Sequence, residues 1–243
     1  MKNIFVSPII FLVFFPFLSF SQIQNIEQDI YTMFDEIVGI DNAGINNGIE
    51  YKEKYRVANK SHSYFNSPYF LVGTIEYDGE LYFNLNMKYN LHEQEIILKV
   101  KSRNSSEVRI KLFKDKIKSF TIGGHRFVKI SSIDSNIDNI YGFYEVTYSD
   151  PLFSLLIKHK KSKKDLHQNG IMFVEYVNAK NEYIILFKGN YKEIKSKKDI
   201  IYLFPNLKEM INNVYKKKKS LRRTNYNQFL TELLQELKLT MLK

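Results

Sequence analysis

The residues between positions 134 and 145 have the types and spacing of a degenerate calcium-binding loop. Asp134, Asn136, Asp138 and Glu145 occupy the first, third, fifth and twelfth positions of such a loop, where oxygen ligands are expected. Asn139 stands where glycine usually makes the sharp turn, and asparagine tolerates that left-handed conformation. Helices normally flank a calcium loop, whereas strand patterns flank this one. The segment is therefore either a calcium site or, more simply, a polar loop between strands.

No other group of side chains has the spacing of a known catalytic or metal-binding motif. The sequence contains no nucleophile elbow, P-loop, dinucleotide-binding glycine pattern or HExxH pair. Because cysteine is absent, a thiol nucleophile, a zinc–thiolate site and a disulfide scaffold are excluded. The histidines lack the four-residue helical spacing of a metal pair, and each is interpreted as a surface residue: His62, His92, His125, His159 and His167. We therefore expect no catalytic residues and no cofactor.

Positive charge is concentrated in the last third of the chain. The whole sequence has 36 Lys and Arg against 26 Asp and Glu, and residues 158–243 hold 20 of the former and 8 of the latter, a net charge of +12. The strongest run comprises Lys216, Lys217, Lys218, Lys219, Arg222 and Arg223. In an exported protein, this run favours an anionic surface or an acidic protein partner over nucleic acid. The simpler interpretation is a solvated helix end.

The first 21 residues have the pattern of a cleavable signal peptide. Lys2 supplies the positive charge, residues 4–20 are almost entirely apolar, and Ser19 and Ser21 precede the expected cleavage site. A membrane anchor would usually be longer and would end in basic residues. No later segment is apolar for long enough to form a transmembrane helix. We therefore expect an exported chain that starts at Gln22 and stays in the periplasm, on the outer-membrane surface or outside the cell.

Alternating residues predict a strand-rich domain over positions 22–195, with a short amphipathic helix over 23–38. Residues 80–91 alternate apolar and polar side chains throughout, which is typical of a strand with one buried face. Asp78-Gly79 and Gly123-Gly124 have the types expected in tight hairpin turns. Further strands are expected at 70–77, 94–101, 107–113, 117–122, 126–131, 142–148, 152–158, 171–177, 183–187 and 190–194, with a lysine-rich loop before residue 171.

The segment 196–243 contains two apolar stripes with helical spacing. The first stripe runs from Leu203 to Tyr215 and the second from Phe229 to Met241, with Asn225 as the N-cap of the second helix. Residues 171–174 and 183–187 are apolar on both faces, so they need a covering layer, and we expect these helices to supply it. The predicted fold is mainly β (α+β): a strongly curved antiparallel sheet or open barrel of about 8–11 strands with two packed C-terminal helices.

Several short stretches resemble exported β-rich proteins of unknown function from Bacteroidetes-type bacteria. The matching stretches are Asn47-Gly48, Glu50-Tyr51, Tyr69-Phe70, Gly73 to Tyr82, Met87 to Leu91, Glu95 to Leu98, Phe120 to Gly124, Gly142 to Glu145, Ser196 to Asp199 and Leu203 to Pro205. The resemblance covers most of the chain after residue 21 and is a pattern of strands and turns. It implies a location in the cell envelope and implies no activity.

The sequence therefore predicts a non-enzymatic envelope or surface protein that binds a ligand or a partner. The 17 tyrosines and 19 phenylalanines could line a site for an apolar small molecule such as a lipid tail, or they could fill the core. One alternative is a hydrolase that acts on cell-envelope polymers, for which convergent carboxylates would be needed. A second alternative is an outer-membrane β-barrel, which only the strand alternation favours.

Overall fold

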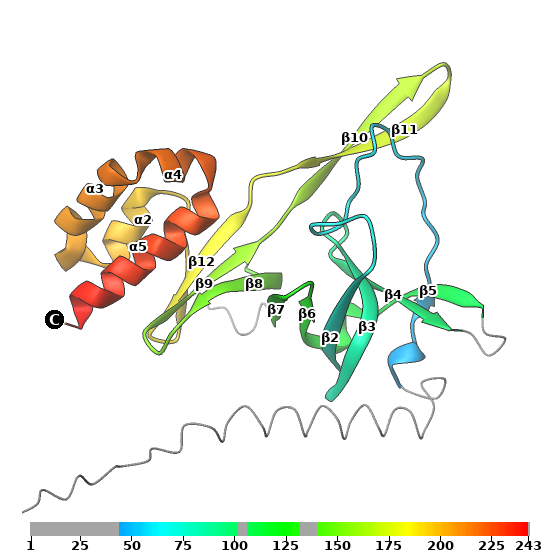
Figure 1. Ribbon diagram of the computed structural model, residues 1–243, viewed down its shortest axis with the longest axis horizontal. Helices are drawn as coiled ribbons and strands as arrows, with labels where there is room; N and C mark the ends of the chain where they lie inside the picture. Colours follow the sequence, from blue (N-terminus) through cyan, green and yellow to red (C-terminus); the bar gives the residue numbers. More distant parts are fainter. Residues whose placement is uncertain (1–43, 102–105, 132–139, 243) are drawn as a thin grey trace, which may run out of the picture.

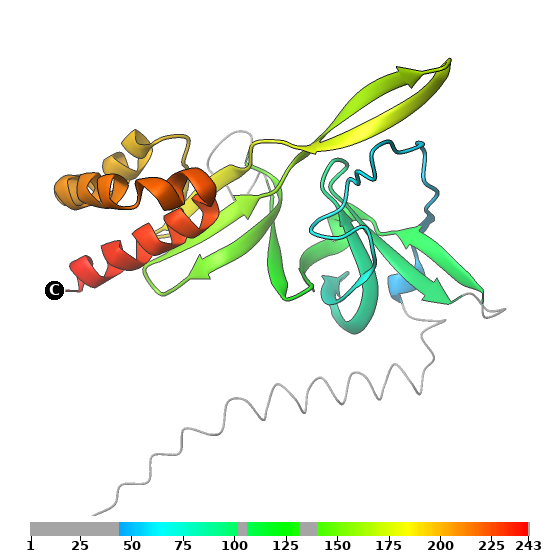
Figure 2. The ribbon, with the colours of Figure 1, turned by 45° about the horizontal axis from the view of Figure 1, so that its top comes forward.

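The computed structural model describes residues 44–101, 106–131 and 140–242. The expected signal peptide and the expected helix over residues 23–38 lie outside this part of the chain. The molecule is elongated (Figure 1), with the helices gathered at one end and the first strands at the other. Figure 2 shows the same arrangement after a rotation of 45°, with one long hairpin projecting from the body.

The described residues form one large sheet of 11 strands, in which every neighbouring pair is antiparallel. In chain order its strands are β1 (Ile49–Glu50), β2 (Leu71–Tyr77), β3 (Glu80–Asn90), β4 (Glu95–Lys101), β5 (Glu107–Lys111), β6 (Ile117–Ile122), β7 (His125–Ile130), β8 (Gly142–Ser149), β9 (Phe153–Lys158), β12 (Glu182–Phe187) and β13 (Asn190–Glu193). Their spatial order is β1-β5-β4-β3-β2-β6-β7-β8-β9-β12-β13. Short 3-10 turns lie at η2 (Gly44–Asn46) and η3 (Lys114–Lys116).

The predicted mainly β, antiparallel architecture is confirmed, but the sheet does not close into a barrel. β1 and β13 form its two edges and do not pair with each other. The two predicted hairpin turns are confirmed as well. Asp78 and Gly79 have φ values of 55° and 87°, and Gly123 and Gly124 have 55° and 83°, the positive values that a tight two-residue hairpin turn requires.

The alternation along β3 is interrupted, contrary to the sequence prediction. Tyr82 is buried and Leu81 is 38% exposed, whereas further along the strand Met87 and Tyr89 are fully buried. Asn84 has a positive φ of 55°, and the β2–β3 register shifts nearby. An extra residue at such a bulge reverses which side chains face the core. The prediction of one continuous apolar face on β3 is therefore wrong for its first residues.

Three apolar core clusters lie along the sheet of the described residues, and the smallest of them contains Ile130, Tyr144 and Leu156. The first lies within β2–β8 and contains aromatic rings in mutual contact, with centroid separations of 4.8 Å for Phe120–Phe127 and 5.3 Å for Tyr89–Phe120. The second packs helices against β9 and β12 through residues such as Leu155 and Ile185. The aromatic side chains of the first core thus fill space between strands.

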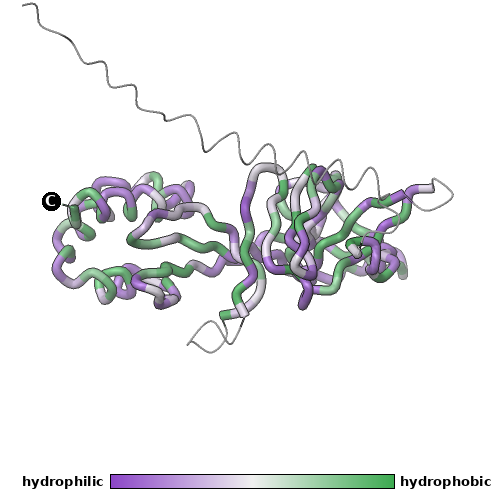
Figure 3. The backbone as a smooth tube through the Cα atoms, turned by 90° about the horizontal axis from the view of Figure 1, so that it is seen from below, coloured by the Kyte–Doolittle hydropathy of each residue, from purple (hydrophilic) through white to green (hydrophobic). Residues whose placement is uncertain are grey.

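Four helices and a 3-10 turn form the helical end of the described chain. They are α2 (Lys197–Leu203), η4 (Pro205–Leu207), α3 (Lys208–Lys217), α4 (Lys219–Thr224) and α5 (Tyr226–Met241). Asn225 is the N-cap of α5 as predicted, since its Oδ1 accepts a hydrogen bond from the Gln228 backbone at 3.1 Å. Apolar and polar residues alternate along these helices (Figure 3), and five α5 side chains from Phe229 to Leu237 are buried. Met241, expected in the same stripe, is 39% exposed.

The lysine-rich segment expected to be a loop is a strand. β10 (Lys161–Gln168) pairs with β11 (Ile171–Asn178) in a two-stranded antiparallel hairpin, which projects away from the helices (Figures 1 and 2). Lys164 faces Glu175 across the pair, an opposite-charge arrangement that favours strand pairing. The helices cover β12 but not β11, so the prediction that they cover both strands is wrong for β11. Val174 of β11 is buried nonetheless, at the position where β11 forms a backbone bridge to Val57.

Among the residues that the structure describes, no helix is both long and apolar enough to cross a membrane.

Candidate functional site

The carboxylate of Glu145 lies between two imidazole rings. His125 Nδ1 donates a hydrogen bond to Oε1 and His159 Nε2 donates one to Oε2, both at 2.5 Å. Glu145 is only 7% exposed, while the side chains of His159 and His125 are 15% and 40% exposed. We call these three residues the His–Glu–His cluster.

Three adjacent strands position this cluster through their register. Glu145 on β8 lies opposite Phe127 on β7 and opposite Ile157 on β9. His125 precedes Phe127 by two residues, and His159 follows Ile157 by two. Because side chains on one strand return to the same face every two residues, both imidazoles are diagonal neighbours of the carboxylate.

The hydrogen bonds of the cluster keep the Glu145 carboxylate charged. Burial would raise the pKa of Glu145, but the hydrogen bonds from His159 and His125 outweigh burial and lower it, so the carboxylate is ionised at neutral pH. The Nε2 atom of His125 lies 3.2 Å from the Asn66 amide nitrogen, so a neutral ring can donate through Nδ1 and accept through Nε2. Phe65 packs against both imidazoles, with ring centroids 5.0 and 5.1 Å away.

His159 borders a polar cavity of about 540 Å³, which we call the amide cavity. Its polar lining consists of four asparagines, two histidines and two lysines: Asn66, Asn178, Asn181, Asn227, His62, His159, Lys160 and Lys161. None of the described residues that line it carries a carboxylate. Each asparagine amide offers two donors and one acceptor, so the lining suits a ligand that has both hydroxyl groups and negative charge.

The two lysines of the amide cavity have different partners. Lys160 pairs with the Glu182 carboxylate at 2.7 Å. Lys161 Nζ donates to the His62 carbonyl at 2.6 Å and lies 3.3 Å from His62 Nδ1. Burial lowers the pKa of Lys161, and burial together with the Lys161 charge lowers the pKa of His62. Lys161 is therefore a partly buried cation held by neutral groups, which leaves its charge available to an anion.

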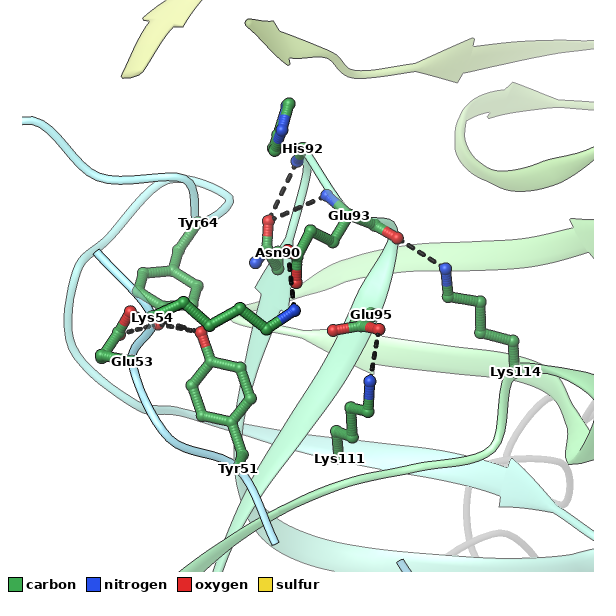
Figure 4. Close-up of polar contacts among 10 residues, drawn as sticks. All are labelled: Tyr51, Glu53, Lys54, Tyr64, Asn90, His92, Glu93, Glu95, Lys111 and Lys114. Carbon is green, nitrogen blue, oxygen red and sulfur yellow. Dashed lines mark hydrogen bonds and ion pairs between the residues drawn. The ribbon is translucent and has the colours of Figure 1, made fainter. Parts of the chain in front are cut away.

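His62 and Phe65, which line this cavity, belong to a loop whose polar contacts at Tyr51, Glu53 and Tyr64 are shown in Figure 4. The Tyr64 hydroxyl donates to Glu53 and lies 3.2 Å from the Tyr51 hydroxyl. Burial is the main cause that raises the pKa of Tyr51 to about 12, and burial also raises the pKa of Tyr64, so both phenols remain protonated donors. Tyr64 also bridges Asn90 at the end of β3. These contacts fix the loop beside the sheet.

The turn after β3 is held by side chains in the same view (Figure 4). Asn90 Oδ1 accepts hydrogen bonds from the backbone of His92 at 3.0 Å and of Glu93 at 3.1 Å. Lys54 pairs with the Glu93 carboxylate at 3.5 Å, which ties the loop to the turn. The ring of His92 lies 5.8 Å from that of Tyr176, so the turn also contacts the projecting hairpin.

Of the four predicted calcium ligands, the structure describes only Glu145, so the calcium loop stays a prediction. Asp134, Asn136 and Asp138 lie outside the described residues. Glu145 lies in β8, where both of its oxygens accept hydrogen bonds from histidines. Among the described residues, no group of three or more His, Cys, Asp or Glu side chains is arranged to hold a metal ion.

The predicted basic run is divided between three environments. Lys216, Lys217, Lys219 and Arg223 are exposed at the α3–α4 junction. Lys218 is neutralised by Glu232 and Glu236 of α5, each at 2.7 Å. Arg222 packs against the Tyr215 ring, with its guanidinium carbon 5.2 Å from the ring centroid. The run therefore includes four free surface cations and two cations with structural contacts.

Sequence reasoning missed the His–Glu–His cluster because it interpreted each histidine singly. The available signal was the set of predicted strands over 126–131, 142–148 and 152–158. If they are aligned as consecutive antiparallel neighbours, Glu145 lies between the two histidines at their ends. The amide cavity had no such signal, because its residues come from segments up to 165 positions apart (227 − 62 = 165).

Comparison of the chain with protein-family models, curated proteins and solved structures gives no match.

Proposed function

We propose that the chain is exported and acts as a non-enzymatic binding protein of the cell envelope or surface. Its ligand is a small acidic saccharide, or a related polyhydroxylated anion, that binds in the amide cavity. The observation that carries this proposal is the lining itself, which combines four asparagine amides with the partly buried cation Lys161. Amides match hydroxyl groups, and the lysine matches a carboxylate or sulfate on the ligand.

The His–Glu–His cluster contributes to binding by fixing one wall of the cavity. The ionised Glu145 orients the His159 ring, which lines the cavity. A ligand that meets a preorganised wall loses less free energy in ordering it, so the affinity rises. Export rests on the signal-peptide pattern of residues 1–21 and on the envelope location that the sequence resemblance implies.

A binding experiment tests this function directly. A chain of residues 22–243 is titrated calorimetrically with a galacturonic acid trimer and with a neutral galactose trimer. The acidic trimer should bind and the neutral one should not. Lys161→Met should weaken binding roughly tenfold or more, since hydrogen bonds to charged groups are worth about 1.5–3 kcal/mol.

Lys164→Met provides the matched control, because Lys164 is an exposed lysine on the same strand. It should bind as the unmodified chain does. Equal binding of the two trimers, or unchanged affinity in Lys161→Met, would contradict the proposal. Export is checked by sequencing the N-terminus of protein recovered from its own host, which should begin at Gln22.

A hydrolase that acts on an envelope polymer is the second candidate, and the His–Glu pair specifically favours it. A carboxylate that accepts from one imidazole nitrogen fixes the ring so that the other nitrogen can act as a general base. In that case His159→Gln should abolish turnover of the polymer while retaining affinity for it. Under the binding-protein proposal, the unmodified chain releases no product and His159→Gln changes only affinity.

A further inference from the structure

A second cavity, of about 590 Å³, lies at the helical end of the molecule. It is lined by the rings of Tyr183, Tyr215 and Tyr226 and by the cations Lys180, Lys195, Lys197 and Arg222. We call it the tyrosine cavity. It shares Ala179 and Asn181 with the amide cavity, and a 2.9 Å hydrogen bond from Tyr183 to Asn227 joins the two walls.

Two of the four cations that line the tyrosine cavity lie at one ring. Lys197 Nζ and the Arg222 guanidinium carbon each lie 5.2 Å from the centroid of the Tyr215 ring. Lys195 is paired with Glu193 at 2.8 Å, so its charge is already balanced. None of the described residues that line the cavity is acidic. Lys197 and Arg222 therefore give the cavity a positive potential beside a flat apolar surface.

Arg222 carries an unused hydrogen-bond donor at this position. Its Nε atom is buried and has no hydrogen-bond partner among the described residues. A guanidinium has donors and no acceptors, and a buried donor without a partner costs free energy. Because Arg222 lines the cavity, a bound oxyanion could be held there by two parallel bonds from the outer nitrogens of its planar guanidinium.

The tyrosine rings determine what the rest of such a ligand can be. Tyr183 and Tyr226 lie edge to face with centroids 5.0 Å apart, and Tyr226 stacks on Phe229 at 5.8 Å. Burial of Tyr215 raises the pKa of its hydroxyl, which therefore stays a neutral donor. The wall thus presents rigid aromatic surface next to the cations, and such surface packs well against another ring.

We infer that the tyrosine cavity binds a small ligand in which an aromatic ring carries a single oxyanion, either a phosphate or a carboxylate. The oxyanion accepts hydrogen bonds from the outer nitrogens of the Arg222 guanidinium and is attracted by Lys197. The ring of the ligand packs against Tyr215 and Tyr226.

The test uses phenyl phosphate, benzoate and inorganic phosphate as probes on the chain of residues 22–243. Phenyl phosphate or benzoate should bind. The affinity for inorganic phosphate should be lower by a factor of roughly ten or more, because inorganic phosphate lacks the ring. The stronger of the two aryl probes identifies the oxyanion. Equal binding by inorganic phosphate, or no binding by either aryl probe, would overturn the inference.

Substitutions locate the site. Arg222→Gln should weaken binding of the stronger aryl probe roughly tenfold or more, whereas Arg223→Gln, at the exposed next position of α4, should leave it unchanged. Equal losses in both variants would refute the assignment of Arg222. If Arg222→Gln does not fold, the ¹⁵Nε–H resonance of Arg222 in the unmodified chain decides the question. It should shift on titration, and a stationary resonance would refute the assignment.

Discussion

Glu145→Gln tests whether the His–Glu–His cluster is held by the charge of its carboxylate. In the folded chain, both oxygens of Glu145 accept hydrogen bonds from imidazole nitrogens at 2.5 Å, and the residue is almost fully buried. Glutamine has nearly the same shape but only one acceptor oxygen. One imidazole then keeps a neutral hydrogen bond, while the other must change its tautomer or lose its partner.

The size of the stability loss expected for Glu145→Gln follows from these hydrogen bonds. A hydrogen bond to a charged group contributes about 1.5–3 kcal/mol and a neutral one about 1 kcal/mol. The His125 side chain is 40% exposed, so water replaces part of its loss, whereas that of His159 is 15% exposed. We therefore expect a loss of about 2 kcal/mol at pH 7. For a chain of this size, that loss lowers the melting temperature by roughly 4–8 °C.

The stability that the Glu145 charge contributes should decrease as the pH falls. The pKa of Glu145 is lower in the folded chain than its ordinary value of 4.5. The stability that its charge contributes is therefore fully present above pH 4.5 and is lost as the pH falls through the lower, folded-state pKa. The measurement is urea unfolding of the unmodified chain and of Glu145→Gln between pH 7 and pH 3. The difference between their free energies of unfolding should be constant down to about pH 5 and should decrease below it.

Glu107→Gln is the control for this measurement, because Glu107 is a fully exposed strand residue whose partner is Lys99. It should leave the melting temperature unchanged. If Glu145→Gln is as stable as the unmodified chain at pH 7, the cluster is not held by charge. A difference in unfolding free energy that stays constant down to pH 3 would also refute a stabilising role of the Glu145 charge.

Three further substitutions or deletions test the fold. Gly73→Ala should destabilise the chain by about 1–3 kcal/mol in urea unfolding, because the new methyl group would lie 2.1 Å from the Thr121 carbonyl oxygen; unchanged stability would contradict this packing. Asn225→Ala should cost about 1 kcal/mol through loss of the α5 N-cap, while Asn213→Ala, at an exposed position within α3, should cost less. A chain that ends at residue 195 lacks α2–α5 and should aggregate and bind a hydrophobic dye, because buried side chains of β9 and β12 become exposed; a soluble, cooperatively folding product would show that the helices are not needed.

The features predicted correctly from the sequence are those encoded by neighbouring residues. Asp78-Gly79 specifies a turn through two residues, and the α5 stripe from Phe229 to Leu237 needs only helical periodicity. Their positions therefore follow from the local sequence. The N-cap Asn225 belongs to the same class, since its hydrogen bond spans three residues.

The features missed depend on partners that are distant in the sequence. β10 is too polar to be recognised as a strand by its own pattern, and it is ordered by pairing with β11. The change in which side chains of β3 face the core depends on the positive φ of Asn84. The alternation of apolar and polar residues along the sequence does not indicate it. The His–Glu–His cluster depends on the register of three strands. Each of these requires knowledge of which strand lies beside which.

The position of the His–Glu–His cluster favours a binding role over a purely structural one. Buried ionic groups usually stabilise a fold no better than well-packed apolar residues of similar volume. The positions facing Glu145 on both neighbouring strands, Phe127 and Ile157, are apolar and fully buried, so this part of the sheet accommodates apolar packing. A carboxylate flanked by two histidines therefore has little advantage for stability here. The carboxylate does benefit the amide cavity, because it fixes the ring of His159 at the cavity wall. Replacing the cluster by apolar residues should therefore preserve the sheet and abolish the binding that we propose for the amide cavity.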